Sequence, residues 1–286
     1  MRVLFDLGDG LALALPGPGV AGGHPEPYPT SSLQKGLLLL DGGQELGGEG
    51  VGFGVPVLKR GARAVFPGSA EVTERRGSSP TVTLVYVLDR VERLGGRRRS
   101  IVFLRPLDWA REAFALLYRR VPPLRRALLA ASNGVRWLLR VHTRFEPIEP
   151  VARVAVTYSL PRTGELLVRA DLAELPRSVT EVVFMNELDA GAFDRWIGDD
   201  GRTAVGAGIG AWNEAGEGWS RFLDAERRVS FACDGRPDEN VPRVRLFRGR
   251  EQARGRLAWA GFGYTLPPGP DGFSYAVRFA READGA

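Results

Sequence analysis

Short runs of apolar residues, often alternating with polar ones, constrain the fold most, because they recur along almost the whole chain. The runs are rich in Val, Leu, Phe and Tyr, and clusters of Gly, Pro, Asp and Asn separate them. This pattern is typical of β-strands joined by turns. The expected strands are residues 2–7, 11–15, 37–60, 81–88, 100–104, 151–160, 165–170, 179–185, 203–212, 228–232, 243–247, 256–266 and 272–280.

So many strands with few helical segments between them predict a mainly β fold. The expected architecture is a set of stacked antiparallel sheets, either a β-sandwich or an open barrel. A Rossmann or TIM architecture is not expected, because strands and helices do not alternate along the chain. We expect residues 1–286 to form a single β domain.

Residues 108–145 depart from the strand pattern. Apolar side chains there recur at the three- and four-residue spacing of a helix, as at Phe114, Leu117 and Val121. Pro122 follows directly and ends this first helix, and further helical spacing follows it. The pattern therefore predicts a short helical insert over 108–145 within the β domain.

The predicted insert is also strongly basic. Residues 108–145 contain eight arginines against Asp108 and Glu112, so they carry +6, whereas the whole chain carries +5. Basic helices bordered by aromatic residues are typical of segments that dock on anionic membrane surfaces. An anionic membrane surface is therefore one expected partner; the plainer alternative is that the helices cap the β structure and turn their arginines to water. Nucleic acid is not expected, because no nucleic-acid-binding motif accompanies the charge.

Few residues are available for cysteine or histidine chemistry. Cys233 is the one cysteine, and His24 and His142 are far apart, so neither a disulfide nor a Cys/His metal site is expected. The sequence predicts no metal and no cofactor. Asp6 and Asp9 interrupt the first apolar residues, which is unlike a signal peptide. A cytoplasmic location, free or at the surface of a membrane, is therefore expected.

Glycines alternate with other residues in three of the predicted strand segments, over 48–54, 206–210 and 260–264. Because glycine weakens a strand, its repeated use indicates that another group approaches the backbone closely. That group is either a ligand lying flat on the sheet or another part of this chain. The spacing does not match the G-x-G-x-x-G pattern of dinucleotide-binding loops.

Carboxylates and aromatic side chains gather near these glycine-rich segments. Carbohydrate chemistry uses such sets, since one carboxyl group protonates a leaving oxygen and another acts as base or nucleophile. Aromatic faces stack on sugar rings, and Arg or Lys can hold an anionic group. The candidate catalytic residues are Glu49, Glu187 and Asp194. The candidate substrate-binding residues are Lys59, Asn186, Arg195, Trp212 and Tyr264.

The sequence thus predicts a carbohydrate-active enzyme, of the hydrolase or lyase type, that acts on a small-molecule or oligosaccharide substrate. One alternative is a membrane-surface protein that binds or converts a lipid or isoprenoid within its β structure. Another is a non-catalytic binding domain. Two carboxylates roughly 5–10 Å apart in an open groove would favour the enzyme, whereas a closed apolar cavity would favour a lipid.

Overall fold

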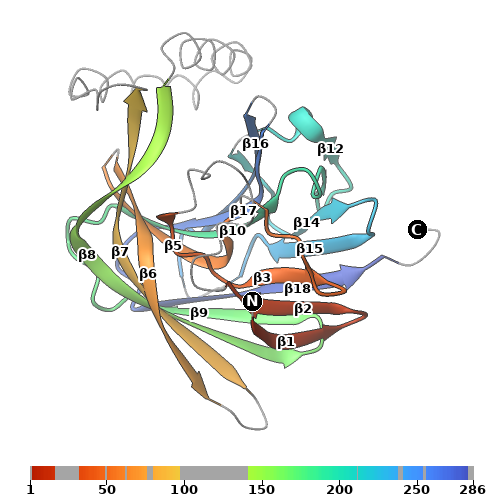
Figure 1. Cartoon of the computed structure of the whole chain (residues 1–286), viewed down its shortest axis with the longest axis horizontal. Helices are drawn as coiled ribbons and strands as arrows, with labels where there is room; N and C mark the ends of the chain where they lie inside the picture. Colours follow the sequence, from red (N-terminus) through yellow and green to blue (C-terminus); the bar gives the residue numbers. More distant parts are fainter. Residues whose placement is uncertain are drawn as a thin grey trace.

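Antiparallel β-strands form nearly all of the regular structure in the computed structural model of the chain (Figure 1). The structure describes residues 2–16, 32–48, 50–61, 63–75, 80–96, 141–210, 212–237, 241–253 and 256–282. A smaller sheet contains β1 (Arg2–Gly8), β2 (Leu11–Leu15), β3 (Leu38–Asp41) and β4 (Gln44–Glu45). A larger sheet contains β5 (Gly52–Arg60), β6 (Arg63–Arg75), β7 (Thr81–Gly96), β8 (Val141–Arg162), β9 (Glu165–Asp171), β10 (Glu181–Asp189), β11 (Arg195–Ile197), β12 (Thr203–Val205), β13 (Asn213–Glu214), β14 (Trp219–Asp224), β15 (Val229–Asp234), β16 (Arg245–Ala253), β17 (Arg256–Leu266) and β18 (Gly272–Arg281).

The larger sheet has 14 strands in the order β12-β11-β14-β15-β18-β9-β8-β7-β6-β5-β10-β17-β16-β13. The alternation of buried and exposed residues explains why these segments form strands. In β18, for example, Phe273, Tyr275, Val277 and Phe279 are buried, and the residues between them are more exposed. Successive side chains of a strand point to opposite faces, so this alternation gives a strand with one apolar face. The prediction of a mainly β fold with antiparallel sheets is confirmed.

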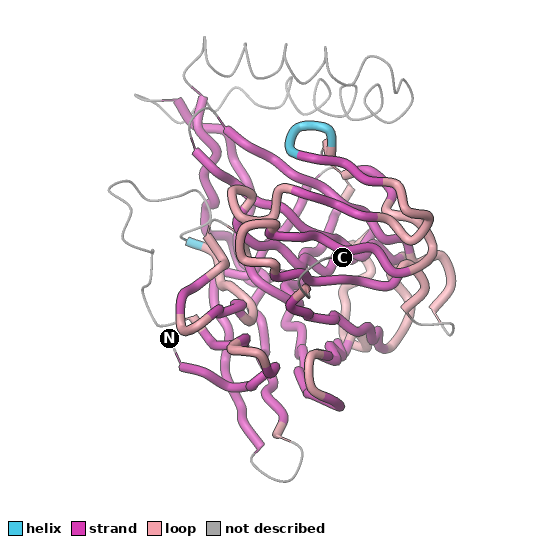
Figure 2. Tube along the Cα trace, turned by 90° about the vertical axis from the view of Figure 1, so that its right-hand side faces the viewer, coloured by secondary structure: helices cyan, strands magenta, loops and turns pink. Residues whose placement is uncertain are grey.

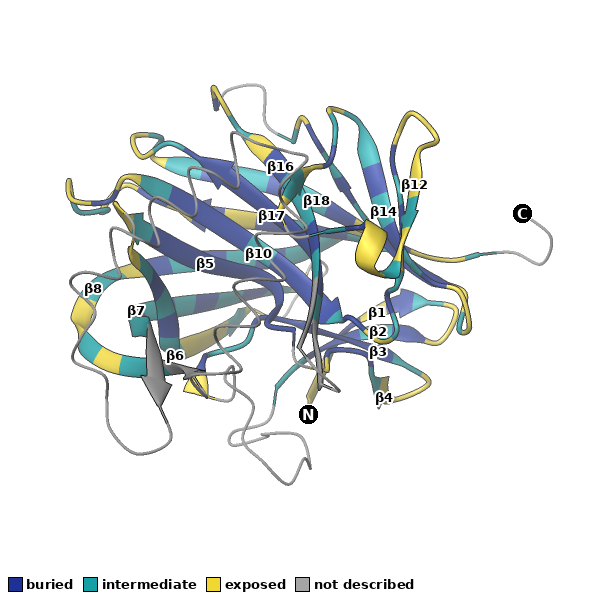
Figure 3. Ribbon diagram, turned by 90° about the horizontal axis from the view of Figure 1, so that it is seen from above, coloured by how far each residue is buried: buried dark blue, intermediate teal, exposed yellow. Residues whose placement is uncertain are grey.

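The larger sheet bends until its own strands pack face to face, as the tube trace in Figure 2 also shows. Ring contacts join strands that are not hydrogen-bonded neighbours. The ring centroid of Phe53 in β5 lies 5.5 Å from that of Phe231 in β15 and 5.0 Å from that of Phe279 in β18. Phe184 in β10 lies 5.5 Å from Phe273 in β18. Each of these strands therefore has an inner face, toward the aromatic core, and an outer face, and Figure 3 shows β5 and β10 buried over most of their length.

A buried hydrogen-bond network lies within this core, where β5 has a bulge. Gly54 has a left-handed backbone (φ +76°), and its N–H donates to Oδ1 of Asn186 over 3.1 Å. The Tyr275 hydroxyl donates to the same oxygen over 3.0 Å. The hydroxyls of Tyr158 and Tyr86 are 2.8 Å apart. Burial raises the pKa of each of these tyrosines, so the network is neutral.

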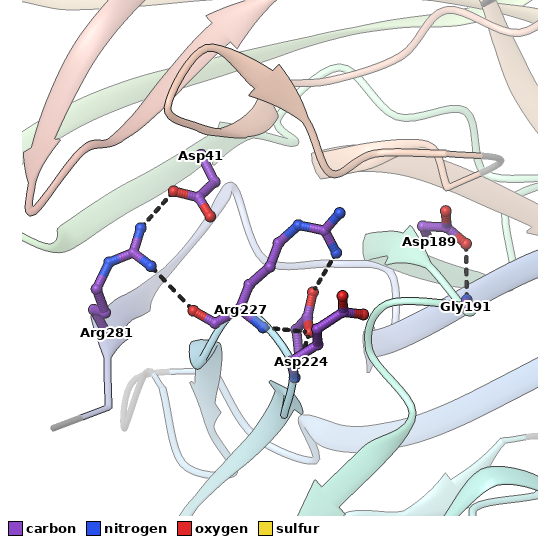
Figure 4. Close-up of polar contacts among 7 residues, drawn as sticks. Asp41, Asp189, Gly191, Asp224, Arg227 and Arg281 are labelled. Carbon is purple, nitrogen blue, oxygen red and sulfur yellow. Dashed lines mark hydrogen bonds and ion pairs between the residues drawn. The ribbon is translucent and has the colours of Figure 1, made fainter. Parts of the chain in front are cut away.

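Arg281 of β18 fastens the smaller sheet to the larger one (Figure 4). Its Nε donates to the carbonyl oxygen of Asp9 over 3.1 Å, and its Nη1 donates to that of Arg227 over 3.0 Å. Its Nη2 pairs with Asp41 at the end of β3. Arg227 is itself held by the buried Asp224, at 3.1 Å between Nη1 and Oδ2. One guanidinium group thus joins two turns and a strand end.

Replacement of Arg281 by methionine is expected to lower the free energy of unfolding by about 1 kcal/mol, because the group is partly exposed. Amide hydrogen exchange should speed up more in β1–β3 than in β5. The matched control is Arg236→Met, which removes an ion pair with Glu217 whose two side chains are mostly exposed, and should change little. Equal exchange rates in the two variants would contradict this role of Arg281.

The predicted helical insert is wrong at its C-terminal end. Residues 141–145 belong to β8, where Thr143 pairs with Leu94 of β7. A β-branched residue such as Thr143 favours extended backbone, and the long pairing with β7 outweighs the helical spacing. Positions 108–140, and with them the predicted membrane contact, lie outside the described residues, so that contact remains a prediction.

A second correction concerns the glycine-rich segment 206–210, predicted as part of a strand over 203–212. The strand β12 ends at Val205, and the 3-10 turn η3 (Gly206–Gly208) follows it. Gly206 and Gly210 have left-handed backbones, which regular strand geometry does not allow outside a bulge. No helix in the part of the chain that the structure describes is long and apolar enough to cross a membrane.

Candidate functional site

The strands β10, β17 and β16 lie side by side and present glycine-rich backbone on their shared outer face. The register aligns Glu187 of β10 with Gly261 of β17, and Gly261 with Gly249 of β16. Gly263 lies two residues further along β17, on the same face as Gly261. Phe262 between them points into the core. The three glycines are therefore neighbours on the outside of the sheet.

Two tryptophan rings lie directly on two of these glycines, Gly249 and Gly263. A Cβ atom placed on Gly263 would come within 2.4 Å of the Trp212 ring, and one on Gly249 would come within 2.6 Å of the Trp259 ring. The centroids of the two rings are 5.1 Å apart and their planes are tilted by 42°. We call Trp212, Trp259, Gly249, Gly261 and Gly263 the tryptophan platform. Only glycine leaves room for the rings to contact the backbone.

The backbone at Trp212 is strained. Its φ of +52° is in the left-handed region, which costs energy for a residue with a bulky side chain. The side chain is nevertheless 37% exposed. The next residue, Asn213, helps to hold this conformation, since its Nδ2 donates to the carbonyl oxygen of Ile209 over 2.9 Å. A strained backbone that keeps an aromatic ring at the surface is typical of a binding site.

Arg248 of β16 supports the same turn from the inner side of the sheet. Its Nη1 donates to the Ile209 carbonyl oxygen, and its guanidinium carbon lies 3.8 Å from the ring centroid of Trp196 in β11. Burial, together with the charge of Arg202, lowers the pKa of Arg248 to about 10. The contact joins β16 to β11, which lie near opposite ends of the larger sheet. Strands β16 and β11 therefore both hold the turn that carries Trp212.

Two carboxylate residues lie on the same outer face beside the platform. Glu187 is 2% exposed and pairs with Gly261 on one side and Gly52 on the other. Asp189, two residues further along β10, pairs with Trp259. Its Oδ1 accepts a hydrogen bond from the Gly191 N–H over 2.8 Å (Figure 4). The two Cα atoms are about 7 Å apart, as the rise of a strand requires.

The segment before β5 packs against β10 at these two residues. A Cβ atom on Gly48 would come within 2.6 Å of Asp189, and one on Gly50 would come within 2.3 Å of the Glu187 carbonyl oxygen. Lys35 donates from Nζ to the Gly48 carbonyl oxygen over 2.9 Å. Other parts of this chain therefore approach the backbone of these glycines, and a side chain would not fit. This was one of the two explanations expected for the alternating glycines.

Two of the predicted binding residues point into the core instead. Tyr264 is fully buried, and its hydroxyl donates to the Asp234 carbonyl oxygen over 2.7 Å. Burial also raises the pKa of this hydroxyl. Asn186 is fully buried and belongs to the hydrogen-bond network around Gly54. Neither side chain faces a ligand that approaches from solvent, because both alternate with the outward residues of their strands.

The other predicted residues are dispersed. Lys59 pairs with Glu181 at the far end of β10, about 20 Å along the strand from Glu187. Asp194 and Arg195 lie at β11, which pairs with β12 and β14. Glu49 lies outside the described residues. The structure therefore brings together Glu187 and Trp212 out of the predicted set.

Sequence reasoning missed Trp259 and Asp189. Asp189 has the two-residue spacing from Glu187 that places both side chains on one face of a strand, so the signal was present. Trp259 precedes the alternating glycines of β17, but its place over Gly249 depends on the register between β16 and β17. Among the residues that the structure describes, no group of His, Cys, Asp and Glu side chains could hold a metal ion.

No family model and no curated protein matches the chain. Among solved structures, the chain is similar to HI1317, with a TM-score of 0.34 and 9% identity over 98% of this chain and 99% of that one. It is also similar to the Slr1438 protein from Synechocystis sp. PCC 6803, with a TM-score of 0.25 and 9% identity over 74% of this chain and 66% of that one. At these TM-scores neither likeness bears on function.

Proposed function

We propose that the chain binds an oligosaccharide on the tryptophan platform and that Glu187 supplies a carboxyl group for chemistry of the hydrolase or lyase type. The observation that carries the proposal is the pair of tryptophan rings laid on glycine backbone beside a carboxylate. Trp212 remains exposed there despite its strained backbone. Left-handed backbone is rare for a residue with a bulky side chain, and strain of this kind gathers at binding and active sites.

The platform suits a sugar ring for two physical reasons. The apolar faces of sugars stack on indole rings, and a large rigid aromatic side chain loses little conformational entropy on binding. The glycines beneath keep the Trp212 and Trp259 rings low and close to the sheet, so a chain of sugar units can lie flat on the two rings.

Glu187 and Asp189 provide the carboxyl groups that hydrolysis needs. In the hydrolytic form of the proposal, Glu187 donates a proton to the glycosidic oxygen while the bond from that oxygen to the anomeric carbon breaks. Asp189 accepts a proton from the water molecule that adds to the same carbon. A carboxyl group removed from water is the kind of group that enzymes use as a general acid, and Glu187 is buried.

The proposal predicts that Trp212→Ala weakens oligosaccharide binding about tenfold or more, because the stacking surface is lost. A glycan array with the wild-type chain first identifies a ligand, and titration calorimetry then compares the variants. The matched control is Trp219→Ala in β14, where Arg278 covers the ring at 3.7 Å, and its affinity should equal that of the wild type. Unchanged binding by Trp212→Ala, with lost binding by Trp219→Ala, would exclude the platform as the site.

A further inference from the structure

A second site lies on the outer face of β8, β9 and β18. These strands border an open cleft with a volume of about 440 Å³. The side chains that line it and face outward include Ala155, Thr157, Arg169, Asp171, Asp271 and Ser274. The cleft lies on the other side of the core from the tryptophan platform, since the inner face of β18 packs against β10 and β17 through ring contacts.

The cleft is built by the register of its strands. One row across the sheet aligns Thr83 of β7, Thr157 of β8, Arg169 of β9 and Ser274 of β18. The Oγ1 atoms of Thr83 and Thr157 are 2.9 Å apart, so this row is linked by a side-chain hydrogen bond. Arg169 is the one long side chain in a row of short hydroxyl-bearing ones.

The next row explains why the surface is hollow. It aligns Ala155 of β8, Asp171 of β9 and Gly272 of β18. Two small residues flank Asp171 and leave open space beside it. The loop before β18 closes one end of the cleft, because the carbonyl oxygen of Asp271 accepts a hydrogen bond from the Leu172 N–H over 2.8 Å.

The charged groups in the cleft are available to a ligand. Arg169 forms no ion pair or hydrogen bond with the described residues, and neither does the carboxylate of Asp271. Asp171 accepts one hydrogen bond, from the Ala173 N–H over 3.1 Å, which leaves its second oxygen available. Arg169 and Asp171 are two residues apart on one face, so their Cα atoms are about 7 Å apart.

We propose that this cleft binds a hydroxylated carboxylic acid the size of a sugar acid. The ligand carboxylate pairs with the guanidinium group of Arg169, whose fork of N–H donors matches a carboxylate. The ligand hydroxyls donate to Asp171 and Asp271 and exchange hydrogen bonds with Thr157 and Ser274. Arg169 supplies one positive charge for one carboxylate, and the two aspartates beside it disfavour the second charge of a phosphate or another dianion.

This site is independent of the platform, and a titration of the whole chain with glucuronate tests it. Glucuronate should bind, whereas glucose, which lacks the carboxylate, should bind at least tenfold more weakly. Arg169→Met should weaken glucuronate binding about tenfold or more, because the charge-assisted hydrogen bonds are lost. The control is Arg153→Met, on the same face of β8 but paired with Glu71, and it should bind as the wild type does.

Further variants and ligands test where glucuronate binds and which of its groups the cleft recognises. Arg169→Met should leave oligosaccharide binding at the tryptophan platform unchanged, so that failure of the platform proposal and failure of this one are distinguishable. Ala155→Leu should weaken binding by filling the cleft without changing its charge. Equal affinity for glucose and glucuronate, or unchanged affinity in Arg169→Met, would overturn the proposal. So would tighter binding of serine, a smaller hydroxylated acid that also carries an ammonium group.

Discussion

Replacement of Gly54 by alanine is expected to lower the free energy of unfolding by about 3 kcal/mol. The added Cβ atom would come within 2.6 Å of Cε1 and 2.7 Å of the hydroxyl oxygen of Tyr158. Overpacking of a core of this kind costs about 1–3 kcal/mol, and the left-handed backbone at φ +76° adds about 1–2 kcal/mol for a residue with a Cβ atom. Tyr158 cannot move aside easily, because its hydroxyl is held by Tyr86.

The matched control for this prediction is Gly43→Ala. Gly43 also has a left-handed backbone (φ +84°), but a Cβ atom there would meet nothing within 4 Å. Gly43→Ala should therefore lower the free energy of unfolding by about 1 kcal/mol, from the backbone conformation alone. Urea unfolding measures both variants. Equal losses at Gly54 and Gly43 would show that the buried tyrosine network does not constrain the bulge.

Replacement of Glu187 by glutamine is expected to lower kcat on a glycan substrate at least 100-fold. The amide keeps the size of the carboxyl group but can neither donate nor accept a proton as an acid–base catalyst, and such catalysis contributes about 10²–10⁴-fold. Binding of the glycan should stay within about threefold of wild type, because Trp212 and Trp259 are unchanged. The measurement is turnover of the glycan that the array identifies, together with its dissociation constant.

The control for Glu187 lies on the same face of the same strand. Glu181 pairs with Lys59 at the far end of β10, and Glu181→Gln should keep full turnover. Retained glycan binding by Glu187→Gln shows that the variant is folded. Full turnover by that folded variant would exclude Glu187 as the acid–base group and leave the platform as a binding surface without catalysis.

The strands were predictable where one face is apolar and the other polar, as in β9 and β18. Which side chains of β10 face the core was not predictable, because apolar residues occupy both faces of that strand. Val182 and Phe184 point inward, and Val183 is buried on the outer side. The sequence therefore could not show that Asn186 would be structural and that its neighbour Glu187 would face the platform.

The candidate site depends on register, which a single sequence does not determine. Glu187 and Trp212 were both predicted as site residues, but their shared face follows from the pairing of β10, β17 and β16. The alternating glycines over 48–54 and 260–264 correctly indicated a close approach to the backbone, but a Cβ atom on Gly206 or Gly208 would meet nothing within 4 Å, so the prediction is wrong there. They did not indicate that the Trp212 and Trp259 rings of this same chain would lie on Gly263 and Gly249.

The most direct test of glycan binding on the tryptophan platform is NMR of the six tryptophan indole N–H signals during titration with the glycan that the array identifies. Single Trp→Phe variants assign the signals. We expect the signals of Trp212 and Trp259 to shift together and to saturate with the dissociation constant, while those of Trp196 and Trp219 stay in place. Saturating binding that moves Trp219 and leaves Trp212 and Trp259 unshifted would contradict it.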